Sequence, residues 1–133
     1  MIAFERAVRF EEVDAAGILF FARYLNFCHD AMEHFFGGLP GGYPSLITKR
    51  RVGLPAVHVA GDFRAPLRYG DVVSIETSCT KIGETSATLR YVFRKEGAEA
   101  ATIDHVIVST SLDTMTKLPL PSDVRAILEA HVA

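Results

Sequence analysis

The sequence predicts an α+β fold in which an antiparallel five-stranded sheet wraps around one long central helix. An amphipathic helical pattern is followed by four consecutive segments with the two-residue periodicity of strands, and tight turns join those segments. An N-terminal segment alternates in the same way. Consecutive strands without intervening helices imply an antiparallel sheet, and the single long helix is the only element expected to cover its apolar face.

The first elements are a strand at 3–10 and a helix at 22–36. Along the helix, apolar residues recur at three- and four-residue steps: Phe21, Leu25, Cys28, Met32 and Phe36. Gly37 and Gly38 are expected to supply the left-handed conformation that often ends a helix. The segment 43–53 shows no clear period, and we expect a loop with at most one helical turn.

The rest of the chain is expected to complete the sheet, with strands at 57–63, 72–81, 85–95 and 99–112. In the third of these, Ala87, Leu89, Tyr91 and Phe93 fall on one face and mostly polar residues fall on the other, which indicates a sheet with one wet side. The strand at 99–112 is expected to expose an edge, so we expect pairing into a dimer. A short helix follows Pro121, with Ser122 as its N-cap.

Composition indicates one globular domain spanning residues 1–133, because 49% of the residues are apolar and 23% are charged. A net charge of -2 gives no positive field that would attract nucleic acid or an anionic membrane. Cys28 and Cys79 fit no zinc or redox spacing and are expected to be free buried thiols. Charges at the N-terminus and the lack of a long apolar window predict a cytoplasmic protein.

The stretch DAAGILFFARY places Asp14 in an almost wholly apolar run before the predicted helix. Taken alone, an aspartate there is most often a turn or capping residue. However, Gly17 lets the backbone approach closely, and the first N–H groups of a helix have no partner within it. A carboxylate beside free amides, in a dry pocket with Phe20, could attack or hydrate an acyl carbon. The amide of Phe21 is the expected main donor.

Other polar residues give weaker signals. His29 and Glu33 lie one helical turn apart without an HExxH pattern, which favours a surface pair or a pocket wall over a metal site. His58 lies in a predicted strand, either as a hydrogen-bonded core residue or as a secondary site residue. The cluster at 49–51 is typical of a solvated loop. It could still contact phosphates together with three further cations: Arg64, Arg68 and Lys81.

The chain resembles the hotdog-fold thioesterases of the 4-hydroxybenzoyl-CoA thioesterase family. The resemblance is carried by VDAAGILFFARYL at 13–25, by CHDAME at 28–33, and by LPAVH at 54–58, which leads into DFRAP at 62–66 and Gly70-Asp71. It spans nearly the whole chain, because the order of strands and helices also agrees. It implies acyl-CoA thioesterase activity without a metal or redox cofactor, and homodimers or homotetramers with the acyl pocket between subunits.

The resemblance implies that Asp14 is the catalytic carboxylate, either as a nucleophile that forms an acyl-enzyme anhydride or as a base that activates water. It also implies that the amide N–H of Phe21 binds the thioester oxygen. An aromatic acyl group is expected, because GILFFARY resembles 4-hydroxybenzoyl-CoA enzymes, and CHDAME and the LPAVH run resemble 1,4-dihydroxy-2-naphthoyl-CoA thioesterases. Six residues are expected to contact the substrate: Gly17, Phe20, His29, Tyr43, His58 and Arg64.

Two positions depart from the hydroxybenzoyl pattern. His29 stands where those enzymes place an acid for the substrate phenol, and the turn at 83–85 replaces their basic CoA-binding cluster. Three alternatives stay open: a thioesterase for short-chain aliphatic acyl-CoA or acyl-carrier-protein substrates, a non-catalytic acyl-CoA binding module, and a hotdog hydratase. The aliphatic branch usually has His and Tyr where this chain has Phe21 and Phe20, and a hydratase needs an Asp and His pair opening the helix.

Overall fold

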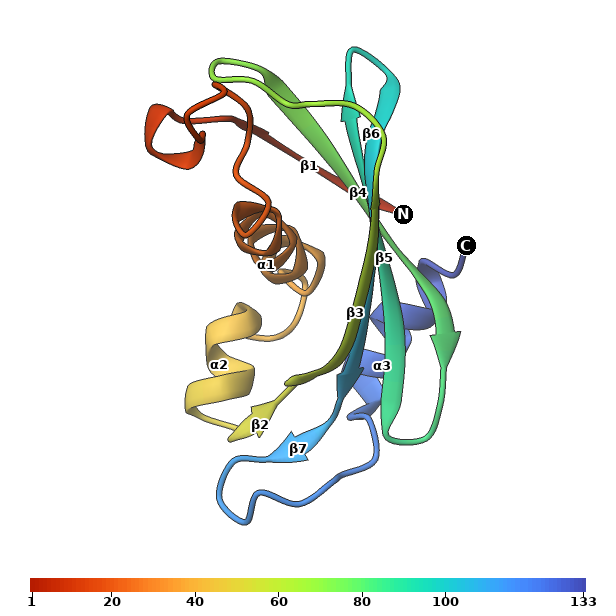
Figure 1. The fold of residues 1–133 in the computed structure, drawn as a ribbon. Helices are drawn as coiled ribbons and strands as arrows, with labels where there is room; N and C mark the ends of the chain where they lie inside the picture. The colour runs from red at the N-terminus through yellow and green to blue at the C-terminus, as the bar shows by residue number, and fades with distance from the viewer.

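The computed structural model describes residues 1–133 and places a curved antiparallel sheet around helix α1 (Arg23–Phe35) (Figure 1). The five strands lie in the order β1 (Ile2–Ala7), β4 (Val72–Ile82), β5 (Ser86–Lys95), β6 (Ala98–Val108) and β3 (Ala56–Phe63). Each neighbouring pair is antiparallel. The predicted α+β class and the antiparallel five-stranded sheet are therefore confirmed.

The core lies between the concave face of the sheet and α1. Along β5 the inward positions are almost fully buried, as the alternation predicts: Ala87, Leu89, Tyr91 and Phe93. The facing residues of α1 are also buried: Phe27, Ala31, Met32 and Phe35. Phe21 and Leu25 belonged to the predicted apolar stripe, but their side chains are 72% and 51% exposed. The stripe therefore extends beyond the core toward an uncovered surface.

Helix α3 (Ser122–Ala130) packs against β4 and belongs to the same buried core as α1, and the ring of His131, just after α3, lies 5.5 Å from the ring of Phe35. Val124 and Leu128 are fully buried there, so the expectation that only one helix covers the sheet was wrong. Ser122 is the first helical residue rather than the N-cap, and the N-cap position is Pro121. The Asp123 carboxylate accepts a hydrogen bond from the Val124 N–H at 3.0 Å, and this satisfies one donor of the first turn.

Glycine plays a different part at the end of α1 than the sequence suggested. Gly37 and Gly38 do not adopt a left-handed conformation. A Cβ on Gly37 would lie 3.0 Å from the His34 carbonyl oxygen, so glycine is needed there for space. The left-handed residues are Gly41 and Gly42, both with φ of 73°, and they turn the chain into the next helix.

The segment 43–53, expected to be a loop with a possible helical turn, contains the longer helix α2 (Gly42–Thr48) and the short strand β2 (Val52–Gly53). β2 pairs with β7 (Thr110–Ser111). The predicted strand at 99–112 is therefore two strands, β6 and β7. The first strand ends at Ala7, and the single turn of 3₁₀ helix η1 (Phe10–Glu12) follows it.

The edge strands of the sheet are β1 and β3, so the expectation that the strand at 99–112 exposes an edge was wrong. β6 is hydrogen-bonded to β5 on one side and to β3 on the other. All eight residues of β3 are exposed, which leaves a long strand with one unpaired side. None of the three helices has the length and apolar character that crossing a membrane requires.

Candidate active site

The loop before α1 is a tight turn closed by backbone hydrogen bonds. The Asp14 N–H donates to the Ile18 carbonyl at 2.9 Å, and the Gly17 N–H donates to the Asp14 carbonyl at 2.9 Å. Gly17 has a φ of 77°, and a Cβ there would meet no atom within 4 Å. Glycine is therefore needed for its left-handed backbone and not, as the sequence suggested, for a close approach.

The two carboxylate oxygens of Asp14 have different surroundings. Oδ1 accepts hydrogen bonds from the Ala16 N–H at 2.8 Å and, more weakly, from the Ile18 N–H at 3.4 Å. Oδ2 accepts no hydrogen bond from the chain, and the residue is exposed. Asp14 therefore closes its own turn with one oxygen and keeps the other free for an external group.

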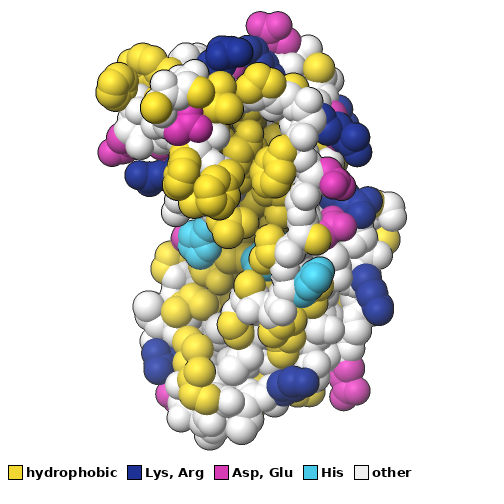
Figure 2. All heavy atoms as spheres, in the orientation of Figure 1, with side chains coloured by type: hydrophobic (Ala, Val, Ile, Leu, Met, Phe, Trp, Pro, Cys, Tyr) yellow, Lys and Arg dark blue, Asp and Glu magenta, His cyan; other side chains and the backbone are white.

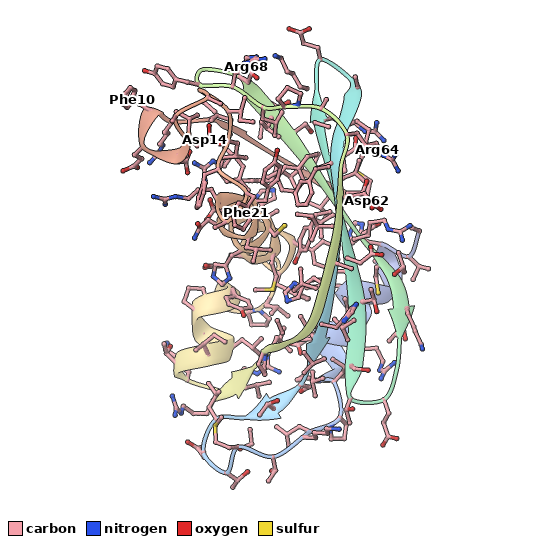
Figure 3. All side chains as sticks on the ribbon, viewed as in Figure 1. Phe10, Asp14, Phe21, Asp62, Arg64 and Arg68 are labelled. Atoms are coloured by element: carbon pink, nitrogen blue, oxygen red, sulfur yellow. The ribbon has the colours of Figure 1, made fainter.

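Free backbone donors lie at the start of α1. The Leu19 N–H donates to the Leu67 carbonyl at 2.7 Å and the Phe20 N–H donates to the Glu12 carbonyl at 2.9 Å, but the N–H groups of Phe21 and Ala22 have no acceptor in the chain. Figure 3 shows Asp14 in the loop beside the start of the helix and Phe21 at that start. A carboxylate oxygen and unpaired N–H groups therefore share one end of α1.

An ion-pair network under the loop holds this end of α1 in place. The Arg6 guanidinium donates to both carboxylate oxygens of Glu12 at 2.7 Å and to Asp30 at 2.7 Å. It also lies 3.7 Å from the centre of the Phe27 ring. Because the Glu12 carbonyl accepts the Phe20 N–H, the network fixes the residue that precedes Phe21. Sequence reasoning missed Glu12, because nothing in the local sequence distinguishes it from its exposed neighbour Glu11.

An apolar groove, here called the α1–β3 groove, runs between α1 and the edge strand. Its first section, about 230 Å³, begins at Phe21 and is bounded by Tyr24 and Phe63. Its second section, about 190 Å³, reaches Cys28, His29 and His105. The two sections share Leu25, Val59 and Ile103. In Figure 2 hydrophobic side chains line this hollow, and histidine side chains lie near its lower end.

The groove is open to solvent in a single chain. Three apolar residues, Leu19, Phe20 and Phe21, precede α1. Leu19 is buried, whereas Phe20 and Phe21 are 42% and 72% exposed. The expected dry pocket is therefore absent from one chain. The reason is geometric, because nothing in the chain covers the outer side of the groove between the helix start and β3.

Two predicted contact residues lie at the deeper end of the groove. The His29 Nε2 and Glu33 Oε2 atoms are 2.8 Å apart, so the predicted helix-surface pair is confirmed. The rings of His29 and Tyr43 lie edge to face with centres 6.3 Å apart. Burial, with a smaller effect from the Glu33 charge, raises the pKa of Tyr43 above its ordinary value, so its hydroxyl stays protonated at neutral pH.

His58 lies away from the groove of its own chain. It alternates along β3 with Val59, which lines the groove, so its side chain is on the opposite face of the sheet. It is exposed and forms no hydrogen bond, so the interpretation as a hydrogen-bonded core histidine was wrong. His58 is exposed because β3 is an edge strand whose outward face is uncovered. The alternating sequence pattern did not show that this strand lies at an edge.

The basic residues are mostly engaged in ion pairs. Arg50 binds Asp123 through two hydrogen bonds of 2.6 and 3.0 Å, and Arg51 binds Asp113 at 3.1 Å, so neither is a free phosphate ligand. Arg64 binds Glu99 at 2.6 Å but keeps an exposed side chain beside Ile18, at the outer end of the groove. Arg68 forms no ion pair and lies at the same end of the molecule (Figure 3).

His105 is a groove residue that sequence reasoning missed. Its Nδ1 lies 2.9 Å from the hydroxyl oxygen of the buried Tyr91. Burial, and to a smaller extent the nearby His29, lowers the pKa of His105 below its ordinary value of 6.5. The signal was available, because Ala101, Ile103, His105 and Ile107 alternate inward and only one of them is polar.

Comparison with known proteins agrees with this fold. Residues 8–128 match the family model described as the thioesterase-like superfamily. The chain is 30% identical over 124 residues to a 1,4-dihydroxy-2-naphthoyl-CoA hydrolase of Crocosphaera subtropica, and the match covers 90% of both proteins.

Solved structures give the same result. A gentisyl-coenzyme A thioesterase superposes with a TM-score of 0.85 and 31% identity, covering 96% of this chain and 99% of the other. A 1,4-dihydroxy-2-naphthoyl-CoA thioesterase from Synechocystis superposes with a TM-score of 0.84 and 25% identity, covering 95% and 93%. The chain therefore belongs to the thioesterase-like superfamily of hotdog-fold proteins and is a thioester hydrolase.

Proposed function

We propose that this thioesterase hydrolyses an aromatic acyl-CoA, of the 1,4-dihydroxy-2-naphthoyl-CoA or 4-hydroxybenzoyl-CoA type, to the free acid and coenzyme A. The observation that carries the proposal is the unpaired Phe21 N–H beside the free Oδ2 of Asp14, at the mouth of an apolar groove. The aromatic rings of Phe21, Tyr24 and Phe63 in the groove wall suit a flat acyl group. The names of the relatives support the same acyl class.

In the proposed mechanism the thioester oxygen accepts a hydrogen bond from the Phe21 N–H. Negative charge that develops on this oxygen is then stabilised by a fixed donor and by the positive end of the α1 dipole. Oδ2 of Asp14 attacks the acyl carbon and the C–S bond breaks, so that coenzyme A leaves as a thiolate that takes a proton from solvent. Water then hydrolyses the anhydride, which releases the acid and restores the Asp14 carboxylate. In the alternative route the same oxygen removes a proton from a water molecule that attacks the acyl carbon directly.

The outer wall of the site would come from a second copy of the chain. The unpaired side of β3 can hydrogen-bond to β3 of another copy, which would join two sheets and cover the groove. We therefore propose a homodimer, which can pair further into a tetramer, in the cytoplasm and without a metal or redox cofactor. Gly17, Phe20, His29 and Tyr43 would contact the acyl group, and Arg64 would approach the coenzyme A phosphates.

A thiol-release assay over a panel of acyl-CoA substrates tests this function. Aromatic acyl-CoAs are expected to be hydrolysed with a kcat/KM at least tenfold above that for acetyl-CoA or hexanoyl-CoA, because only a ring fills the groove. A higher kcat/KM for the aliphatic substrates would contradict the aromatic assignment. Tight binding of acyl-CoA without any thiol release would instead identify a binding module.

A further inference from the structure

His105 is the polar member of an apolar wall. On the inward face of β6 its neighbours Ala101, Ile103 and Ile107 are buried apolar residues. The strand register places Leu89 and Val59 directly beside it on β5 and β3. The ring lines the second section of the α1–β3 groove and is half-buried, so it is accessible from the groove. A polar group in such a wall requires partners that satisfy it.

Tyr91 determines which ring nitrogen of His105 carries the proton. The Tyr91 side chain is fully buried, and the only hydrogen-bond partner of its hydroxyl oxygen is Nδ1 of His105, at 2.9 Å. A buried hydroxyl must donate its proton, and Nδ1 is the only acceptor within reach. Nδ1 therefore accepts, and the neutral ring carries its proton on Nε2. No group of the chain accepts a hydrogen bond from Nε2.

We propose that the Nε2–H of His105 binds an oxygen substituent at the far edge of the acyl ring, so that the α1–β3 groove selects ring-hydroxylated acyl groups. This inference rests on the proposed function, which places the thioester carbonyl at the Phe21 N–H. Cys28 and His105 line the same section of the groove. From Phe21 to Cys28 the chain advances about 10 Å along the helix, at 1.5 Å per residue. An aromatic acyl group with an oxygen at its far edge can span that distance, whereas a short aliphatic group cannot.

A hydroxyl suits this position better than a carboxylate does. His105 is neutral and surrounded by apolar side chains, so it offers one hydrogen bond and no positive charge to a buried anion. The Glu33 carboxylate lies on the same side, bound to His29 at 2.8 Å, and would repel a second negative group. A phenolic oxygen can accept the Nε2–H bond without the desolvation cost of a full charge.

Isothermal titration with two thioether analogues that cannot be hydrolysed tests the inference independently of turnover. 4-Hydroxyphenacyl-CoA and phenacyl-CoA differ only in the phenolic oxygen. The dimeric wild-type protein is expected to bind the hydroxylated analogue about tenfold more tightly, the range expected for one hydrogen bond to a buried donor. His105→Phe keeps a ring of similar shape without the donor, and is expected to reduce the affinity ratio to about one.

Two further variants serve as controls for this experiment. Val59→Ala removes an apolar neighbour of His105, and is expected to weaken both analogues and leave their affinity ratio unchanged. Tyr91→Phe keeps the packing but frees the His105 tautomer, and is expected to lower the ratio several-fold. The inference is overturned by equal affinities in the wild-type protein, or by a ratio that persists in His105→Phe. A tenfold affinity ratio in the wild-type protein, together with no thiol release from acyl-CoA substrates, would refute the proposed function and leave this inference standing.

Discussion

At the scale of single residues, Asp14 has a structural role that is compatible with the chemical role proposed above. Its Oδ1 closes the turn through the Ala16 N–H, and its Oδ2 is left without a partner beside the start of α1. A turn residue and a catalytic residue are usually treated as competing interpretations of one aspartate. Here the turn orients the carboxylate, because the hydrogen bond to one oxygen limits the directions in which the other can point.

Glu12 connects the ion-pair network to the active-site loop, and Glu12→Gln tests its importance. The carboxylate is almost completely buried and accepts two hydrogen bonds from Arg6. Removing its charge leaves the Arg6 guanidinium partly uncompensated, so the free energy of unfolding is expected to fall by about 3 kcal/mol. Urea denaturation measures the change.

Glu11→Gln is the matched control, because the Glu11 side chain is exposed and forms no hydrogen bond. This variant should change the free energy of unfolding by less than about 0.5 kcal/mol. Equal effects would contradict the structural role of the network.

Some of these residues could be predicted from sequence and others could not. Asp14, Gly17 and Phe21 lie within a few positions of one another, so local sequence was sufficient to predict that they lie together at the start of the helix. Glu12 and His105 act through partners that are distant in sequence or on a neighbouring strand, such as Tyr91 at 14 positions from His105. Those contacts depend on strand register, which one sequence does not specify at the level of individual side chains.

At the scale of elements, the sequence predicted the strands that are joined by hairpins, but it did not predict the position of β3 or the helix α2. β4, β5 and β6 follow one another through short turns, so their neighbours are fixed by connectivity. β3 comes before them in the chain but lies at the far edge beside β6, a long-range pairing that no local pattern indicates. α2 was missed because glycines and Pro44 surround its start and conceal a short helix.

The Arg50–Asp123 pair links the segment after α2 to α3 and gives a pH-dependent contribution to stability. The hydrogen bonds from Arg50 hold the pKa of Asp123 below its ordinary value of 3.8. Because this pKa is lowered by folding, the contribution is present above about pH 4 and is lost as the pH falls through the folded-state value. The pair is about one-third exposed, so it contributes at most about 1 kcal/mol.

Thermal unfolding of Asp123→Asn at two pH values checks that contribution. The variant is expected to melt a few degrees below the wild type at pH 7 and by a smaller margin at pH 3. Asp113→Asn is a suitable control, because the Arg51–Asp113 pair has only one hydrogen bond and is more exposed. This variant should change the melting temperature less than Asp123→Asn does. A melting difference for Asp123→Asn that grows as the pH falls would contradict the assignment.

At the scale of the whole molecule, the single chain leaves the groove and the edge of β3 uncovered. The strand beside the groove has an unpaired edge. Four apolar side chains that line the groove remain exposed: Phe21, Leu25, Val59 and Phe63. Exposed apolar surface continuous with a free strand edge is typical of an interface between copies of a chain. The assembly proposed above would bury both features together.

Val57→Lys tests whether β3 forms that interface. Val57 is 62% exposed in the single chain, so a lysine there should not disturb the fold, but two lysines would meet near paired edge strands. Sedimentation velocity is expected to show the wild type as dimers or tetramers and the variant as monomers. Met115→Lys, at an exposed methionine in another loop, should keep the wild-type assembly. A dimeric Val57→Lys variant would place the interface elsewhere.

The most direct test of the central claim is the turnover number of Asp14→Asn with an aromatic acyl-CoA, beside that of Asp14→Ala. Asparagine keeps an oxygen that can accept the Ala16 N–H and so preserves the turn, but it has no charge with which to attack an acyl carbon or activate water. The account predicts that both variants stay folded and lose at least about a hundredfold in kcat. A near-native kcat in Asp14→Asn, with activity lost only in Asp14→Ala, would show that residue 14 serves the loop and not the chemistry.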